Sequence, residues 1–391
     1  MTDLENRALL PAGLRDILPP EAGFEAGIRE ALAATFASHG YERVKPPLVE
    51  FEEGLTSGAG AAVSADTFRL MDPVSQRMMG VRADMTTQIA RIAATRLGDV
   101  PRPLRLSYTG EVLRIRGTQL RPERQFAQVG AELIGTESAA ADIEIIAIAV
   151  DSLRDIGVPD LSVDLTIPPL IPALMDGMNL SPNDYDALRD ALDRKDVGAV
   201  RERGQNHADE LCRLMEGTGS AERALEVLSG LSLPSAPAGE LARLKSVVEG
   251  LGRRIPDLDI TVDPVENRGF EYHTGVGFTF FARGERGEIG AGGRYVTLPN
   301  GNGEDKGEPA TGFTLFIDTI LRVVLETELP PKVFVPQGAD ADGAAALREE
   351  GWITIAALDD FEDVAAEARR QGCSHVWTDG KPAPIERDQE Q

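Results

Sequence analysis

The feature of this sequence that most constrains the fold is a change of pattern in the middle of the chain. From about residue 168 to residue 254 the pattern is wholly helical, whereas short strand patterns lie on both sides of it. Strand patterns that resume after an all-helical segment indicate one sheet-containing body with an insertion. We therefore predict an α+β domain, built on an antiparallel sheet with flanking helices and interrupted by a helical insertion.

The segment before the insertion predicts helices packed on a mixed antiparallel sheet. Apolar residues recur at helical spacing from about Glu21 to Ser38, and Gly40 is suited to end this helix as a left-handed cap residue. Residues Tyr41 to Glu50 predict an extended strand that runs into a proline break. The other elements expected here are strands at about 67–72, 77–82, 104–116, 125–135 and 162–165, and helices at about 86–97 and 139–156.

The segment after the insertion predicts the rest of the sheet and then a separate small unit. Strands are expected at about 259–265, 275–281 and 288–290, and the run from Gly312 to Leu321 predicts a glycine followed by an apolar helix. Pro330-Pro331 is typical of a linker, and beyond it a short α/β unit is expected to end in a polar tail from Lys381. The predicted boundaries are 1–167 and 255–330 for the two parts of the main domain, 168–254 for the insertion and 331–391 for the C-terminal unit.

The charge of the chain argues against a nucleic-acid partner. Forty Lys and Arg stand against 64 Asp and Glu, which gives a net charge of −24. Most affinity for a polyanion comes from cationic side chains that displace counterions. Residues 331–391 carry 6 basic and 13 acidic side chains, a net of −7. Solubility is the simpler explanation of the acidic excess by itself.

The remaining composition predicts a cytoplasmic protein without a membrane span or a metal centre. No run approaches 18 consecutive apolar residues, and the acidic N-terminus lacks the basic-then-apolar signature of a secretory signal. Cys212 and Cys373 provide neither a disulfide framework nor a metal-ligand cluster. We expect no cofactor.

Several polar residues around the predicted strands are suited to hold a free amino acid with an imidazole side chain. Carboxylates and an amide suit an ammonium group and imidazole N–H donors, guanidinium groups suit a carboxylate, and aromatic rings offer flat faces. The glycines Gly292 and Gly293 allow backbone to approach a ligand closely. The candidate ligand-binding residues are Asp84, Thr86, Arg114, Gln128, Glu132, Arg268, Tyr272 and His273.

Each of these residues also has a purely structural interpretation. Asp84 could cap the helix that begins near Thr86. Gln128 and Glu132 share one face of a strand and could be solvated, and Tyr272 and His273 could be core or rim residues. What favours the binding interpretation is the presence of four blocks in a fixed order along the chain.

These blocks resemble the motifs of class II aminoacyl-tRNA synthetases, and of histidyl-tRNA synthetase in particular. The resemblance covers about residues 10–325, apart from the insertion. It implies the class II fold, and it implies that the first block lies at a dimer interface while the others surround a histidine site. The blocks are Gly40–Glu50, Val81–Thr87, Leu113–Arg116 with Arg124–Gly135, and Asn267–Gly275 with Gly290–Tyr295.

The chain departs from a working synthetase at the positions that the family uses for ATP. Arg116 stands where the family has a glutamate that reads adenine, and Thr319 stands where it has an arginine that stacks on adenine and grips phosphate. Phe316 replaces a small residue upstream of that position. In the amino-acid site the departures are milder, with Asp84 for a glutamate and His273 for a tyrosine. A neutral hydroxyl cannot replace a guanidinium fork on phosphate oxygens.

This combination resembles the regulatory subunits of ATP phosphoribosyltransferase, a family related to histidyl-tRNA synthetase but without aminoacylation activity. The resemblance implies no catalytic residues, and as partners a short catalytic subunit, a second copy in a class II-type dimer, and free L-histidine as a feedback signal in histidine biosynthesis. It implies neither a nucleic-acid nor a membrane partner. Two alternatives remain open: an active histidyl-tRNA synthetase with divergent ATP motifs, and a histidine-sensing paralogue with an unrelated role.

Overall fold

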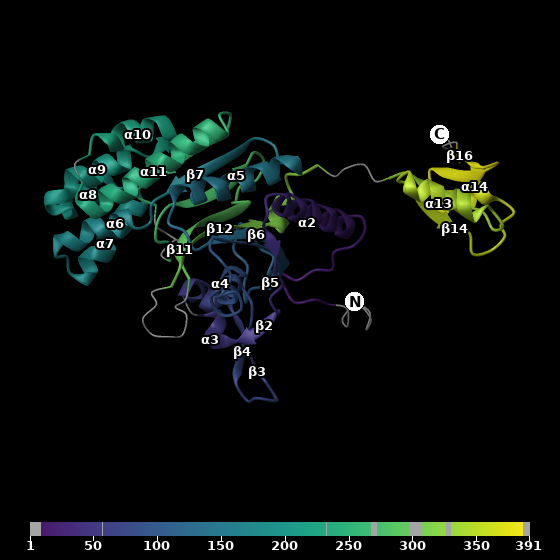
Figure 1. The fold of residues 1–391 in the computed structure, drawn as a ribbon, viewed down its shortest axis with the longest axis horizontal. Helices are drawn as coiled ribbons and strands as arrows, with labels where there is room; N and C mark the ends of the chain where they lie inside the picture. The colour runs from purple at the N-terminus through teal and green to yellow at the C-terminus, as the bar shows by residue number, and fades with distance from the viewer. Residues whose placement is uncertain are drawn as a thin grey trace. The chain divides into compact units, whose positions relative to one another are not determined.

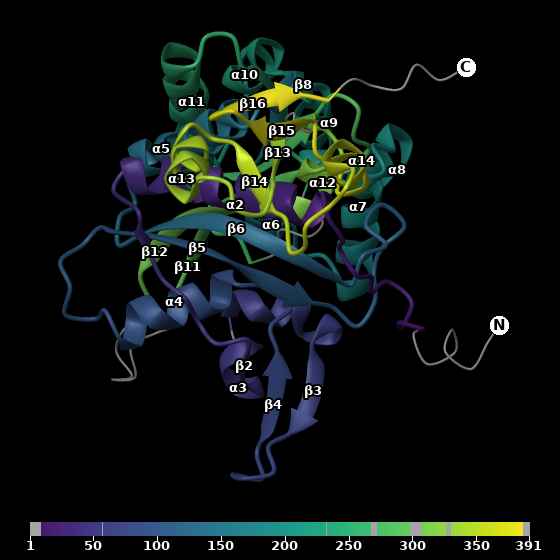
Figure 2. The same cartoon turned by 90° about the vertical axis from the view of Figure 1, so that its right-hand side faces the viewer.

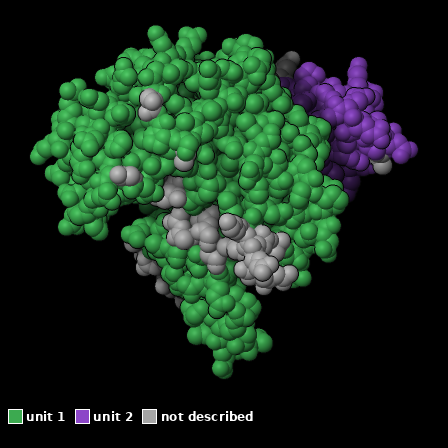
Figure 3. All heavy atoms as spheres, turned by 60° about the vertical axis from the view of Figure 1, so that its left-hand side comes forward, with its two compact units in different colours: residues 1–325 green, residues 326–391 purple. Residues whose placement is uncertain are grey.

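The computed structural model describes residues 9–56, 58–231, 233–266, 272–297, 307–325 and 330–385. The chain divides into two compact units, residues 1–325 and residues 326–391, which Figure 3 draws in different colours. The first unit contains the main sheet and the insertion. The second unit is a small sheet with its own helices. None of the described helices is both long enough and apolar enough to cross a lipid bilayer.

The first unit is built on a nine-stranded sheet whose strands come from both sides of the insertion, as expected for an α+β fold of the class II type. Most neighbours are antiparallel, but β1 pairs with β5 and β7 pairs with β9 in parallel. In spatial order the strands are β1 (Glu42–Arg43), β5 (Leu104–Leu113), β6 (Gln125–Ile134), β12 (Pro309–Phe316), β11 (Gly290–Val296), β10 (Gly277–Ala282), β7 (Leu161–Thr166), β9 (Asp259–Asp263) and β8 (Gly219–Ser220).

Helices cover both faces of the central strands. Helices α2 (Glu21–Ser38) and α5 (Ala139–Asp155) lie along one face, and α4 (Thr86–Thr95) lies on the other, as Figure 2 shows. The first face is closed by a large apolar cluster, in which the rings of Phe36 and Phe313 meet edge to face with centroids 5.4 Å apart. A smaller cluster under α4 packs around Tyr108 and Phe126. The central strands are therefore buried on both sides.

The strand expected from Tyr41 to Glu50 is two strands in two different sheets. β1 joins the main sheet, whereas β2 (Val49–Phe51) pairs with β4 (Met78–Val81), which in turn pairs with β3 (Phe68–Met71). The prolines between them cannot donate ladder hydrogen bonds, so the chain changes sheets there. The short helix α3 (Glu52–Leu55) follows β2, and a 3-10 segment (Gly58–Asp66) leads into β3.

The insertion lies beside β7 at one end of the sheet (Figure 1). The expectation that it is wholly helical is wrong, because β8 pairs with β9 and adds a ninth strand. Two residues are too few to show a strand period in the sequence. Its helices are α6 (Leu170–Met175), α7 (Pro182–Asp193), α8 (Val197–Arg203), α9 (Ala208–Glu216), α10 (Ala221–Ser229) and α11 (Ser235–Arg254), with 3-10 turns at Asp176–Met178 and Gln205–His207.

The apolar run after Gly312 is a strand where a helix was expected. Gly312 lies inside β12, which pairs with β6 on one side and β11 on the other, and only Ile317–Ile320 (α12) are helical. Ala310, Phe313 and Leu315 are all buried. A strand covered on both faces has no apolar–polar alternation, so its period cannot be told from that of a buried helix.

The second unit is a four-stranded sheet in the order β14-β13-β15-β16, packed around Phe334, Ala368 and Cys373. The expectation of a polar tail from Lys381 is wrong for its first residues, since β16 pairs with β15. Two prolines at alternate positions conceal this edge strand in the sequence. The elements are β13 (Lys332–Val335), α13 (Ala341–Glu349), β14 (Ile353–Ala356), α14 (Val364–Arg370), β15 (His375–Thr378) and β16 (Lys381–Pro384).

Candidate functional site

A cavity of about 110 Å³ lies against the α4 face of the main sheet. Strands β6, β11 and β12 contribute to its walls, together with the residues that lead into α4 and into β10. Five of the eight predicted site residues line it, and they come from three of the four sequence blocks. The lining residues are Asp84, Thr86, Glu132, Tyr272, His273, Ala291, Gly292, Gly293, Tyr295, Gly312, Phe313, Thr314 and Phe316.

Glu132 is the buried acidic centre of this cavity. Its side chain projects from β6, and the residue is only 1% exposed. Its carboxylate accepts hydrogen bonds from the hydroxyl of Tyr295 at 3.0 Å and from that of Tyr108 at 3.5 Å. A Cβ atom at Gly312, on the neighbouring strand, would lie 1.7 Å from Oε2. The backbone approach permitted by this glycine therefore makes room for the carboxylate.

The surroundings of Glu132 favour its neutral form. Burial raises the pKa of this carboxyl to about 8, and the charge of Asp84 acts in the same direction, while the hydrogen bonds from Tyr295 and Tyr108 oppose them. Among the described residues no cationic side chain forms an ion pair with Glu132. A ligand that brings a cation or N–H donors would supply what the carboxylate lacks.

Asp84 is held in place by its neighbours at the entrance to α4. One carboxylate oxygen accepts the backbone N–H of Thr86 at 2.9 Å, and the other accepts the side-chain amide of Gln128 at 2.9 Å. The amide oxygen of Gln128 in turn accepts the backbone N–H of Met85 at 3.1 Å. Asp84 thus accepts the N–H of the first residue of α4, although Met85 and not Asp84 is the N-cap residue, and it also lines the cavity.

Gln128 lies behind the cavity wall, where it orients Asp84. Gln128 is completely buried and Glu132 is 1% exposed. The interpretation of these two residues as a solvated strand face is therefore wrong. Both face the α4 side of β6, because positions four apart in a strand point the same way. The Gln128 amide therefore supports the site from behind and does not line the cavity.

Tyr272 and His273 form an aromatic corner of the cavity. Their ring centroids are 4.2 Å apart and the ring planes are tilted by 54°. His273 packs against Gly293, where an added Cβ would lie 2.8 Å from Cε1 of the imidazole. Burial lowers the pKa of His273 to about 3, so its imidazole is neutral at physiological pH.

The two arginines predicted to hold a ligand carboxylate are placed differently from the rest. Arg114 does not line the cavity; its Nε donates to the carbonyl oxygen of Ala83 at 3.4 Å, and its guanidinium lies 5.1 Å from the ring centroid of Phe126. Because Ala83 precedes Asp84, Arg114 still lies near the wall. Arg268 lies outside the described residues.

Sequence reasoning missed several residues of this site. Tyr295 ends one of the quoted sequence blocks, and its position beside the glycines Gly292 and Gly293 was the available signal. Tyr108 is one of many apolar and aromatic residues in β5, and nothing in the sequence marks its hydroxyl. That hydroxyl lies 2.7 Å from Oγ1 of Thr314 and 3.3 Å from the carbonyl oxygen of Phe313.

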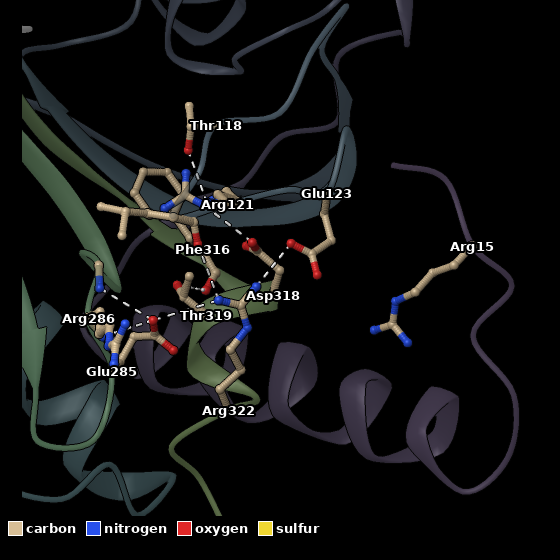
Figure 4. A network of polar contacts seen from close by, with 12 residues as sticks. Arg15, Thr118, Arg121, Glu123, Glu285, Arg286, Phe316, Asp318, Thr319 and Arg322 are labelled. Atoms are coloured by element: carbon tan, nitrogen blue, oxygen red, sulfur yellow. Dashed lines mark hydrogen bonds and ion pairs between the residues drawn. The ribbon is translucent and has the colours of Figure 1, made fainter. Parts of the chain in front are cut away.

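Position 319 is filled by a small, locally bonded side chain, and an arginine already covers the neighbouring aromatic ring. Thr319 is only 1% exposed, and its hydroxyl donates to the carbonyl oxygen of Phe316 at 3.0 Å. Phe316 itself lines the cavity, and the guanidinium of Arg121 stacks over its ring at 3.8 Å, as Figure 4 shows. The phosphate-gripping arginine of the synthetase motif therefore has no counterpart at position 319.

The arrangement suits a small ligand that donates hydrogen bonds. The cavity presents two carboxyl groups, two tyrosine side chains and two threonine hydroxyls around a small space. Among the described residues there is no cluster of His, Cys, Asp and Glu that could hold a metal ion.

The fold and the sequence together define the class of this protein. A family model described as histidyl-tRNA synthetase matches residues 13–320. The fold is similar to that of a solved protein from Bacillus halodurans described as an ATP phosphoribosyltransferase regulatory subunit/histidyl-tRNA synthetase, with a TM-score of 0.76, 24% identity and coverage of 93% of this chain and 96% of that one. The chain is a histidyl-tRNA synthetase-like protein with the class II fold.

Its closer relatives identify the branch within this class. An ATP phosphoribosyltransferase regulatory subunit from Paramagnetospirillum magneticum is 54% identical over 96% of this chain and 97% of its own length. One from Rhodospirillum centenum is 52% identical over 97% of both chains. The chain belongs to the family of ATP phosphoribosyltransferase regulatory subunits.

Proposed function

We propose that this chain acts as the non-catalytic regulatory subunit of an ATP phosphoribosyltransferase and works with a short catalytic subunit in the first step of histidine biosynthesis. Near-full-length identity of 54% and 52% to proteins of that name supports this role. The filled surroundings of Thr319 are consistent with a protein that does not use ATP for aminoacylation. The subunits would assemble in the cytoplasm as class II-type dimers within a hetero-oligomer.

The observation that carries the proposed ligand is the pair of carboxyl groups, Asp84 and Glu132, in one cavity. Asp84 suits the ammonium group of free L-histidine, and the buried carboxyl of Glu132 suits an imidazole N–H. The aromatic corner of Tyr272 and His273 would pack against the imidazole ring. Thr86 would add a hydroxyl and Gln128 would hold Asp84, while Arg114 and Arg268 are the proposed partners of the ligand carboxylate.

Feedback inhibition would follow from the coupling of this cavity to the catalytic subunit. A ligand can shift the activity of a partner only if it binds two states of the complex with different affinity. The proposal therefore predicts that histidine binds to this chain and that the complex responds to it.

Reconstitution tests the proposal directly. Mixing the full chain with a short catalytic subunit should produce a co-eluting complex, raise the rate of phosphoribosyl transfer to ATP, and make that rate sensitive to histidine. Glu132→Gln in the same mixture should keep the activation and weaken the histidine response by about tenfold or more, since one buried polar contact contributes on the order of 1–3 kcal/mol. Separate elution with no activation would reject the regulatory role.

A charging assay separates this proposal from the alternative of an active synthetase. Incubation of the chain with ATP, histidine and its tRNA should yield no aminoacyl-tRNA. Turnover in that assay would favour a histidyl-tRNA synthetase with divergent ATP motifs. Histidine binding without any effect on a catalytic subunit would favour a sensor with another role.

A further inference from the structure

A network of charged side chains, centred on the buried pair Arg121 and Asp318, lies directly behind the Phe316 wall of the cavity. It joins three segments that are far apart in the sequence: the loop of residues 117–123 between β5 and β6, the segment 285–288 before β11, and residues 316–322 at the end of β12 and in α12. Figure 4 shows these segments converging on Arg121 and Arg322. No residue of this network outside Phe316 lines the cavity.

Arg121 is the centre of the network. Its side chain is 8% exposed, and its Nε lies 3.3 Å from a carboxylate oxygen of Asp318, whose side chain is 7% exposed. Its Nη2 donates to the carboxylate of Glu288 at 3.2 Å. The flat guanidinium covers the ring of Phe316 at 3.8 Å. One buried cation therefore holds both the ring that forms the cavity wall and the carboxylate two residues beyond it.

The loop that carries Arg121 is itself fixed. The backbone N–H of Thr118 donates to the carbonyl oxygen of Arg121 at 2.7 Å, and the N–H of Arg121 donates back to the Thr118 hydroxyl at 3.0 Å. Arg322 then binds Glu123 of the same loop at 3.0 Å and lies 3.7 Å from Glu285. Because the turn is closed and pinned, Arg121 has little freedom to leave Phe316.

We propose that Arg121 is a positioning residue for the cavity: through its stack on Phe316 and its ion pair with Asp318, the loop of residues 117–123 sets the cavity wall and with it the affinity for the ligand. Phe316 has the cavity on one side and Arg121 on the other. In a cavity of about 110 Å³, a small displacement of one wall changes the contacts of the whole ligand. The identity of the ligand rests on the proposed function, whereas the positioning of the wall does not.

The first experiment measures histidine binding to the full chain by calorimetry. Arg121→Gln removes the cation and should raise the dissociation constant by about tenfold, within the range of couplings between contacting residues. Arg121→Lys keeps a charge for Asp318 but loses the planar stack. Its dissociation constant should lie between that of the unaltered chain and that of Arg121→Gln. Arg116→Gln is the matched control, because Arg116 lies beside the same loop, is 75% exposed and does not contact Phe316. Equal affinity in Arg121→Gln and Arg116→Gln would overturn the proposal.

A second measurement needs no ligand and so remains decisive if histidine does not bind. Hydrogen exchange of the amides of residues 309–320 should be faster in Arg121→Gln than in the unaltered chain. The amides of residues 161–166, in strand β7 three strands away in the same sheet, should change little. Unchanged exchange at 309–320 would overturn the proposal even if the proposed function holds. Failure of the unaltered chain to bind histidine, with faster exchange in the variant, would reject the ligand and retain the positioning role.

A double variant separates positioning from loss of fold. Arg121→Gln alone leaves Asp318 buried without its partner, which is destabilising. Arg121→Gln combined with Asp318→Asn removes both charges and should restore the midpoint of thermal unfolding while the exchange at residues 309–320 remains fast. If exchange at residues 309–320 in the double variant returned to the slow rate of the unaltered chain, only the unpaired charge of Asp318 would have mattered, and the role of the stack would be rejected.

Discussion

At the scale of single residues, Glu132 makes the stability of the first unit depend on pH. Its pKa is about 8 in the folded protein, against an ordinary value of 4.5. The folded state therefore holds a proton that the unfolded state releases between those two values. Stability contributed by the neutral carboxyl is complete below about pH 4.5 and is lost as the pH rises to about 8, with a slope of at most about 1.4 kcal/mol per pH unit.

Denaturant unfolding of the ligand-free protein at pH 5, 6.5 and 8 tests this expectation. Glu132→Gln should lose less stability between pH 5 and pH 8 than the unaltered chain, because an amide does not titrate. Glu30→Gln serves as the control, since the side chain of Glu30 is 71% exposed. Parallel pH profiles for all three proteins would show that Glu132 titrates normally.

The acidic residues of the cavity could be predicted from the sequence, whereas the side chains that pack behind and beside them could not. Asp84, Thr86, Glu132, Tyr272 and His273 could be chosen because they lie in blocks that resemble a known site, and the structure brings these five together. The residues that were missed act through geometry that no local pattern encodes. The Tyr108 hydroxyl reaches Glu132 and Thr314 only because β5, β6 and β12 are neighbours in the sheet.

At the scale of elements, a buried ion pair joins strand β11 to helix α5. Arg294 donates to both carboxylate oxygens of Asp142 at 3.1 and 3.2 Å and to the carbonyl oxygens of Thr136 and Ser138. The two side chains are 4% and 0% exposed. Arg243 of α11 lies 3.8 Å from the same carboxylate. The pair therefore connects a strand of the cavity to a helix of the core and to one of the insertion.

Removing one partner of this pair should cost far more than removing both. Arg294→Met should lower the free energy of unfolding by about 3–5 kcal/mol, because it leaves Asp142 charged and buried. Arg294→Met with Asp142→Leu should recover most of that loss. Urea denaturation measures both variants. A single variant as stable as the double one would show that Asp142 is satisfied by Arg243 alone.

The elements that could be predicted are those with a clear period and a clear end. The helix at Glu21–Ser38 was expected at its observed bounds, and Gly40 has the left-handed φ of +82° expected of a cap residue. The sequence of strand β12 predicts a helix because the strand is buried on both faces, and β8 is not predicted because two residues have no period. Strand β16 was hidden by its prolines. In each case tertiary pairing decided what local pattern could not.

At the scale of the whole molecule, the charge predicts that the chain does not retain tRNA. A net charge of −24 opposes the phosphate backbone, and the last 61 residues, 331–391, are acidic as well. In a gel-shift assay at about 150 mM salt, the chain should leave labelled tRNA free, whereas an active histidyl-tRNA synthetase in the same assay should shift it. A shift that weakens steeply as salt is added would reveal a cationic surface that net charge conceals.

The burial of Thr319 bears on how many substitutions an arginine at this position would require. An exposed threonine could be changed to arginine in one step. Here the side chain lies in the interior between Ile317 and Ile320, bonded to the backbone of Phe316, and Arg121 already covers that ring. A new guanidinium would need the wall, the covering arginine and the ion pair with Asp318 to change together. A single Thr319→Arg substitution therefore does not fit the interior that the present chain builds around this position.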